Sequence, residues 1–232
     1  MITESVNPSS CAPTAKIVRT VLNAGSGGAG ASPLHPAFPR AAWKEVRLDI
    51  DAAAKPDIVG SLGNMRGLVA DQTFDAIWSS HSLEHLHAHE VLPALGEFRR
   101  ILRPDGFAIV GCPDLIAIAR FVLETHLEAV AYESKMGPIR PLDMIYGHEK
   151  SIAAGSGWMA HRTGFTSKRL GRLATEAGFV ETRVVEADMF DLWALLLMPE
   201  ANDAALAEQF KGTNLATLAE APGPTAQKCA AA

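Results

Sequence analysis

Residues 81–90, HSLEHLHAHE, hold four of the eight histidines of this 232-residue chain. Their first five letters, H-x-x-E-H, match the reversed zinc-peptidase pattern, in which two histidines one helical turn apart bind zinc and a glutamate activates water. A histidine near a reacting hydroxyl is also the natural general base, because its pKa lies close to neutral pH. The segment therefore raises two interpretations, a metal site or a catalytic base.

The elements expected around the histidines argue against zinc. FDAIWSS, residues 74–80, has the composition of a strand, so His81 falls at the end of that strand and Ser82 can cap only a short turn. Pro93 suits the first turn of a helix over 91–102 better than the interior of a helix that begins at His81. Without a continuous helix the two histidines of the pattern do not share a face, and we expect no metal.

Strands and helices alternate along the chain. This alternation predicts an α/β, Rossmann-like fold with a seven-stranded sheet, mostly parallel with an antiparallel last strand, and with helices on both faces. The last strand is antiparallel because only the short turn EADMFD precedes it. The predicted strands are 19–25, 45–50, 56–62, 74–80, 107–113, 179–185 and 192–198, and the predicted helices are 91–102, 114–130 and 166–178.

Composition bounds the rest of the chain. We expect one domain over 16–200 with a lid or substrate-side insertion at 144–166, preceded by a flexible segment at 1–15 and followed by an Ala-rich tail at 201–232. The net charge of -5 and the lack of a basic run disfavour nucleic acid as a partner. The odd number of cysteines, no export signal and no membrane-length apolar run indicate a soluble, cytoplasmic protein without a membrane partner.

Three glycines in residues 23–30, NAGSGGAG, satisfy the dinucleotide pattern G-x-G-x-x-G. That pattern needs a helix directly after the loop, since the helix N-terminus holds the pyrophosphate. Here prolines recur at three-residue spacing over 33–39, which excludes an ordinary helix. The loop thus favours a ligand that needs a close approach of the backbone but has no phosphate, such as S-adenosylmethionine.

With these segments in place, most of residues 18–198 resembles the class I S-adenosylmethionine-dependent methyltransferases, in their methyltransferase type 11-like, small-molecule group. VLNAGSGGAG resembles the first motif of that group, VRLDID the second, FDAIWSSHSLEHL the fourth-strand segment, and EFRRILRPDGFAIVGCPDL the helix, turn and fifth strand. The nearest match is a bacterial subgroup of predicted methyltransferases with LN-x-GSG as first motif. The resemblance implies methyltransferase activity with S-adenosylmethionine as cofactor.

The resemblance also implies where that cofactor binds. Asp49, at the end of the second strand, is expected to accept both ribose hydroxyls, with Asp51 as the fallback. Asn23 stands where the family usually has an acidic residue, and Ser61 where it has an aspartate near the adenine. The full set of expected cofactor residues is Asn23, Gly25, Ser26, Gly27, Asp49, Ile50, Ser61, Leu62, Ser80 and His81.

Methyl transfer requires mainly that donor and acceptor are aligned and water is excluded. If the acceptor is a hydroxyl, His81 and His85 are the first candidates for the catalytic base. Glu84 is expected to fix the local backbone, and His87 and His89 to lie on the surface. The expected substrate residues come from the insertion and are Tyr146, His148, His161 and Arg162, with Trp158 as a further stacking candidate.

The sequence therefore predicts an enzyme that methylates oxygen or nitrogen of a small molecule, for example a sugar or glycan precursor, as a monomer or a homodimer. Two alternatives stay open. Asn23 and Ser61 motivate a non-catalytic cofactor-binding or interaction protein on the same fold. The glycine pattern motivates a nicotinamide-dependent oxidoreductase, although the prolines that follow it count against that interpretation.

Overall fold

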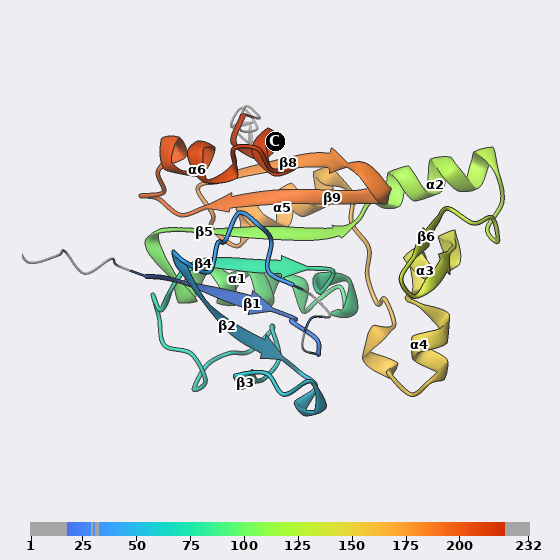
Figure 1. The fold of residues 1–232 in the computed structure, drawn as a ribbon, viewed down its shortest axis with the longest axis horizontal. Helices are drawn as coiled ribbons and strands as arrows, with labels where there is room; N and C mark the ends of the chain where they lie inside the picture. The colour runs from blue at the N-terminus through green and yellow to red at the C-terminus, as the bar shows by residue number, and fades with distance from the viewer. Residues whose placement is uncertain (1–17, 29, 31–32, 221–232) are drawn as a thin grey trace, which may run out of the picture.

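The computed structural model describes residues 18–28, 30 and 33–220. A seven-stranded sheet with the order β3-β2-β1-β4-β5-β9-β8 forms its centre (Figure 1). β9 pairs antiparallel with both of its neighbours, and the strands from β3 to β5 pair in parallel. The predicted fold is confirmed. The strands are β1 (Arg19–Ala24), β2 (Trp43–Asp49), β3 (Ile58–Val59), β4 (Phe74–Ser80), β5 (Leu102–Pro113), β8 (Glu181–Ala187) and β9 (Asp191–Leu197).

The helices predicted beside the sheet form where the capping and breaking signals place them. Pro93 lies in the first turn of α1 (Val91–Ile101), and Thr166 caps α5 (Ser167–Glu176) by accepting a hydrogen bond from the Arg169 amide. The helix predicted over 114–130 ends earlier, because α2 covers only Leu115–Glu124. No helix occurs among the described residues between β1 and β2, as the prolines predict.

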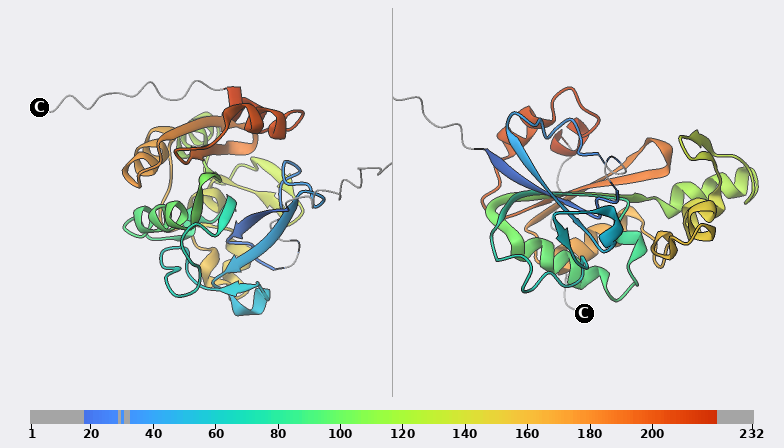
Figure 2. Two further views of the ribbon diagram at one scale, coloured as in Figure 1. Left: turned by 90° about the vertical axis from the view of Figure 1, so that its left-hand side faces the viewer. Right: turned by 60° about the horizontal axis from the view of Figure 1, so that its bottom comes forward.

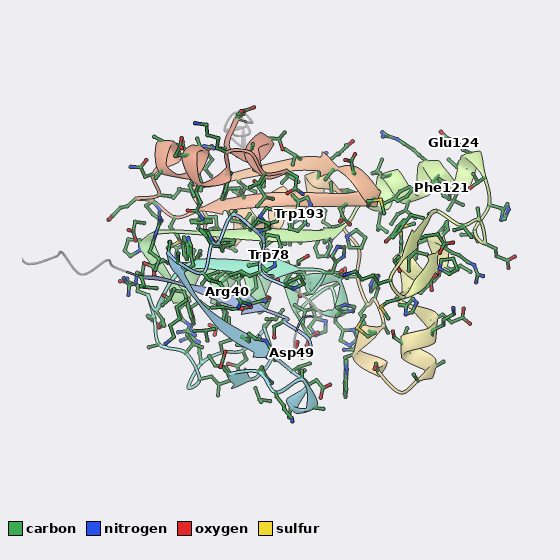
Figure 3. The ribbon with its side chains drawn as sticks, in the orientation of Figure 1. Arg40, Asp49, Trp78, Phe121, Glu124 and Trp193 are labelled. Atoms are coloured by element: carbon green, nitrogen blue, oxygen red, sulfur yellow. The ribbon has the colours of Figure 1, made fainter. Side chains whose placement is uncertain are left out.

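The two faces of the sheet are covered differently. α1 and α5 cover one face, and the opposite face is covered by the proline-rich segment 34–42 with α6 (Asp203–Phe210) and α7 (Ala216–Glu220) (Figure 2). On that second face Trp78 of β4 and Trp193 of β9 stack with ring centroids 5.0 Å apart (Figure 3). Buried apolar groups on a sheet face must be covered, and here elements far apart in the sequence cover them together.

The C-terminal residues are a correction to the expected boundaries. The prediction places 201–232 outside the domain, because the segment is rich in alanine and has few large apolar residues. In the structure those few residues are buried on the sheet: Leu206, Phe210, Leu215 and Leu218. The domain therefore extends to at least residue 220. Residues 221–232 and the segment predicted at 1–15 lie outside the described residues.

The insertion begins earlier than the predicted 144–166. After α2 the chain forms a hairpin of β6 (Tyr132–Ser134) and β7 (Gly137–Ile139), followed by α3 (Pro141–Tyr146) and α4 (Glu149–Ala153). These elements lie beyond the carboxyl ends of the parallel strands, at the right of Figure 1. Ligands of open α/β sheets bind at this edge. Within the described part of the chain, no helix combines the length and the apolar character needed to span a bilayer.

Candidate active site

Two cavities lie side by side at the carboxyl edge of the sheet. The cavity at the glycine loop, hereafter the first cavity, measures about 430 Å³, and its neighbour beneath the insertion, the second cavity, about 600 Å³. The expected cofactor residues that line the first cavity are Gly25, Gly27, Asp49, Ile50, Ser61, Leu62 and His81. The two cavities share their lining at Gly25, Gly27, His81, His85 and Met159. A molecule in one cavity is therefore adjacent to a molecule in the other.

The glycine loop packs tightly against the segment after β4. The Gly25 and Ser26 amides donate to the Leu48 carbonyl at 2.9 and 3.1 Å. Gly25 has a φ of +79°, and a Cβ at this position would lie 2.1 Å from Ser82 Oγ. Only glycine fits such a position, because a side chain would both strain the backbone and clash. The Ser82 hydroxyl itself donates to the Ala24 carbonyl at 3.1 Å.

Asp49 organises the loop from the end of β2 (Figure 3). One carboxylate oxygen accepts from the Gly27 amide at 2.7 Å and the other from the Asp51 amide at 2.9 Å. The Arg47 guanidinium donates to the Gly27 carbonyl from the same strand. Asp51, the fallback candidate, instead caps the 3-10 helix η1 (Ala52–Ala54) by accepting from the Ala53 amide at 2.8 Å.

Three of the expected cofactor residues lie outside the lining of the first cavity. Asn23 is buried, and its amide donates to Glu45 Oε1 on β2 at 2.7 Å. Ser26 lines a separate hollow beneath the proline-rich segment, and Ser80 lines the second cavity. The Asn23 contact joins the neighbouring strands β1 and β2. The sequence resemblance suggested a role in cofactor binding for Asn23 and did not suggest this structural one.

His81 lines both cavities, and its ring lies between the carboxylates of Glu84 and Asp191. Its φ of +52° turns the chain out of β4, and its amide donates to the Gly111 carbonyl at 2.9 Å. Nδ1 lies 3.3 Å from Glu84 Oε1, and Nε2 lies 3.3 Å from Asp191 Oδ2. Burial opposes the positive charge, but the contacts with Asp191 and Glu84 outweigh it and raise the pKa of His81 to about 10.

The H-x-x-E-H segment does not form the helix that a zinc peptidase needs. Its residues form only the 3-10 turn η2 (Leu83–His85), and α1 starts six residues after His85 at Val91. This agrees with the prediction from Ser82 and Pro93. His87 and His89 are exposed and stack on each other with centroids 5.7 Å apart.

His161 from the insertion packs against His85 of this segment. The backbone carbonyl of Glu84 accepts from the Arg162 and Thr163 amides at 2.8 and 3.2 Å, which fixes the HRTGF segment against η2. The rings of His85 and His161 consequently lie 4.9 Å apart, centroid to centroid. Burial lowers the pKa of His161. Burial would raise the pKa of Glu84, but the contact with His81 and the charges of the surrounding imidazoles lower it below its usual range.

The other expected substrate residues are distributed unevenly. His148 lines the second cavity, whereas Arg162 and Trp158 line the first. Tyr146 is 64% exposed and lines neither. The second cavity also has lining residues that the sequence analysis missed, among them Tyr132, Phe190 and Asp191. Tyr132 comes from the hairpin, Phe190 from the turn before β9 and Asp191 from the start of β9. The sequence signal for the last two was that EADMFD follows a strand at the same edge, and Tyr132 had no such signal.

Comparisons with known proteins agree with the fold. Residues 22–110 match the family model described as a methyltransferase domain. A protein from Pyrococcus horikoshii is 16% identical over 79% of this chain and 83% of its own, with a TM-score of 0.51. The CMeT domain of the citrinin polyketide synthase is 13% identical over 82% of this chain and 48% of its own, with a TM-score of 0.52.

A methyltransferase from Aquifex aeolicus described as SAM dependent is 15% identical over 78% of this chain and 82% of its own, with a TM-score of 0.47. No curated protein matches the chain. Residues 22–110 therefore match a methyltransferase domain, and the sheet that contains them has the Rossmann-like arrangement predicted for class I methyltransferases.

Proposed function

We propose that this protein is an S-adenosylmethionine-dependent enzyme that methylates an oxygen or nitrogen atom of a small, polyhydroxylated molecule such as a sugar or glycan precursor. The observation that carries the proposal is the shared wall of the two cavities. The cofactor would occupy the first cavity and the acceptor the second, so that donor and acceptor meet at the residues that line both.

The residues of the first cavity fit S-adenosylmethionine, which when bound supplies an electrophilic methyl group. Each Asp49 oxygen accepts one backbone amide, and each keeps a further lone pair for a ribose hydroxyl. Ser61 and Leu62 from the loop after β3 line the same cavity. No helix N-terminus follows the glycine loop among the described residues, which suits a cofactor without phosphate.

The second cavity suits a small acceptor rather than a polymer. Its volume of about 600 Å³ lies in the range of pockets for small ligands. Glu84 and Asp191 contribute carboxylates to its lining, which would repel nucleic-acid phosphates. Tyr132 and Phe190 stack with centroids 6.5 Å apart and an angle of 20°, and offer apolar ring faces to a sugar or heterocycle.

The geometry favours His85 over His81 as the group that takes a proton from the acceptor. Both ring nitrogens of His81 face carboxylates, so both carry hydrogens and neither has a free lone pair. His85 contacts a carbonyl only through Nδ1, at 3.3 Å from the Ala160 oxygen, and Nε2 keeps its lone pair. His81 would then hold Glu84 and Asp191 in place while His85 acts on the acceptor.

Calorimetric titration of the metal-stripped protein with S-adenosylhomocysteine tests the cofactor half of the proposal. One-to-one binding with about micromolar affinity is expected. Incubation with methyl-labelled S-adenosylmethionine and a total cell extract tests the acceptor half, with the label expected in the small-molecule fraction. Label found only in protein or RNA would contradict the proposed acceptor class.

A further inference from the structure

We propose that Glu84, His85 and His161 bind one divalent transition-metal ion at the wall between the two cavities, and that this ion holds the acceptor oxygen. The metal site stands on the geometry of the three side chains alone. The role toward the acceptor rests on the proposed function. The inference departs from the metal-free chemistry expected from the sequence, because only the fold brings His161 to the H-x-x-E-H segment.

The three side chains converge from two distant parts of the chain. A carboxylate oxygen of Glu84 and one ring nitrogen from each histidine lie within 4.8 Å of one another. Ligand atoms around a bound Zn²⁺ stand roughly 2.0–2.2 Å from the ion. The atoms must therefore approach further on binding, and the torsions of the half-buried His85 and His161 side chains can supply that movement.

Each histidine makes the backbone contact that commonly supports a metal-binding imidazole. His161 Nδ1 lies 2.9 Å from the Met144 carbonyl oxygen, and His85 Nδ1 lies 3.3 Å from the Ala160 carbonyl oxygen. A carbonyl only accepts hydrogen bonds, so Nδ1 carries the hydrogen in both rings and Nε2 keeps its lone pair. A hydrogen bond from the second ring nitrogen to a backbone carbonyl is the usual support of metal-binding histidines.

Glu84 provides the independent observation that points to a missing ligand. Its side chain is only 1% exposed, yet neither carboxylate oxygen has a hydrogen-bond partner in the described part of the chain. The His81 nitrogen at 3.3 Å from Oε1 provides one charge contact, outside hydrogen-bond geometry. A buried carboxylate without hydrogen bonds is costly, and a cation bound to it would remove that cost.

Two imidazoles and one carboxylate favour a transition-metal ion over Mg²⁺ or Ca²⁺, which prefer oxygen ligands. Three protein ligands leave coordination positions open toward the second cavity, which Glu84, His85 and His161 all line. An acceptor hydroxyl bound there would lose its proton to solvent more readily. Its oxygen would then take the methyl group as the carbon–sulfur bond breaks, which leaves a neutral thioether. With the ion bound, the Nε2 lone pair of His85 is used by the metal. The ion and solvent then replace His85 in the removal of the acceptor's proton, which is the role that His85 has in a site without the ion.

Titration of the metal-stripped protein with Co²⁺, followed by visible absorption and by metal analysis after gel filtration, tests the site without any acceptor. One equivalent is expected to bind with micromolar affinity or better. Glu84→Gln and His161→Gln should each weaken binding at least about tenfold. The double variant His87→Gln/His89→Gln is the matched control, because these exposed histidines lie in the same segment and should leave the affinity unchanged.

Unchanged Co²⁺ affinity in both site variants, or loss of binding in the His87/His89 control, would overturn the inference. If Glu84→Gln fails to fold by circular dichroism, the half-buried His161→Gln variant decides. The two proposals fail separately. Failure of S-adenosylhomocysteine to bind contradicts the proposed function and leaves the Co²⁺ result to stand, whereas full methyl transfer in chelator contradicts only the metal role.

Discussion

The two cavities differ in the segments and side chains that line them. One side of the first cavity is formed by the glycine loop, the end of β2 and the loop after β3, which Asp49 holds together, and the other side by η2 and the insertion. The second cavity has imidazoles, carboxylates and aromatic rings that come from η2, the hairpin, the HRTGF segment and the turn before β9. A site that holds an invariant cofactor can be encoded by short motifs, whereas a site for a particular acceptor is assembled by the fold.

Gly25→Ala should have the largest effect on the first cavity. The φ of +79° costs a non-glycine residue of order 1–3 kcal/mol, and the new Cβ would overlap Ser82. The glycine loop must then move, and affinity for S-adenosylhomocysteine should fall by about a hundredfold in calorimetry. Gly28→Ala is the control, since apart from its chain neighbours no atom of the described residues lies within 4 Å of its Cβ position. Equal losses in both variants would show that the loop is sensitive as a whole.

Asp49→Ala should have the next largest effect. It removes a single carboxylate with two roles: this group accepts from the Gly27 amide, and it is also expected to accept the ribose hydroxyls. Affinity for S-adenosylhomocysteine should fall at least about tenfold, with the domain still folded by circular dichroism. Asp51→Ala removes only the cap of η1, at a cost of about 1 kcal/mol in the free energy of unfolding. Near-normal binding by Asp49→Ala would mean that the ribose site lies elsewhere.

The same contrast explains how far the sequence could predict the structure. The mostly parallel sheet with its antiparallel last strand, the absence of a helix among the described residues after the glycine loop, and the position of Asp49 at the end of β2 all follow from local patterns. His161 and Asp191 could not be placed, because they reach the wall only through the Glu84–Arg162 backbone contact and the β8–β9 turn. Burial of the C-terminal helices was missed for a related reason: a few apolar residues such as Phe210 suffice when the sheet leaves a face open.

Asp191→Asn should change the pH dependence of stability in the metal-free protein. The pKa of His81 is raised to about 10 from 6.5, so its ion pairs contribute fully below pH 6.5, and the contribution disappears as the pH rises toward 10. Removal of one carboxylate lowers that pKa, so stability should be lost at a lower pH in the variant. Urea unfolding over a pH series measures this, and Asp188→Asn, an exposed neighbour, should behave as the wild type.

The smallest expected effect is a difference in methyl transfer between variants of the two tyrosines of the insertion. Tyr132 lines the second cavity and stacks with Phe190, whereas Tyr146 is 64% exposed and lines neither cavity. In the assay with methyl-labelled S-adenosylmethionine and cell extract, Tyr132→Ala should reduce labelling of the small-molecule fraction several-fold. The variant removes a ring face from the acceptor site, and the lost stacking energy is on the order of 1 kcal/mol. Tyr146→Ala should leave labelling unchanged, and both variants should bind S-adenosylhomocysteine normally. A larger loss in Tyr146→Ala would place the acceptor on the outer surface of the insertion, and the second cavity would no longer be the better candidate.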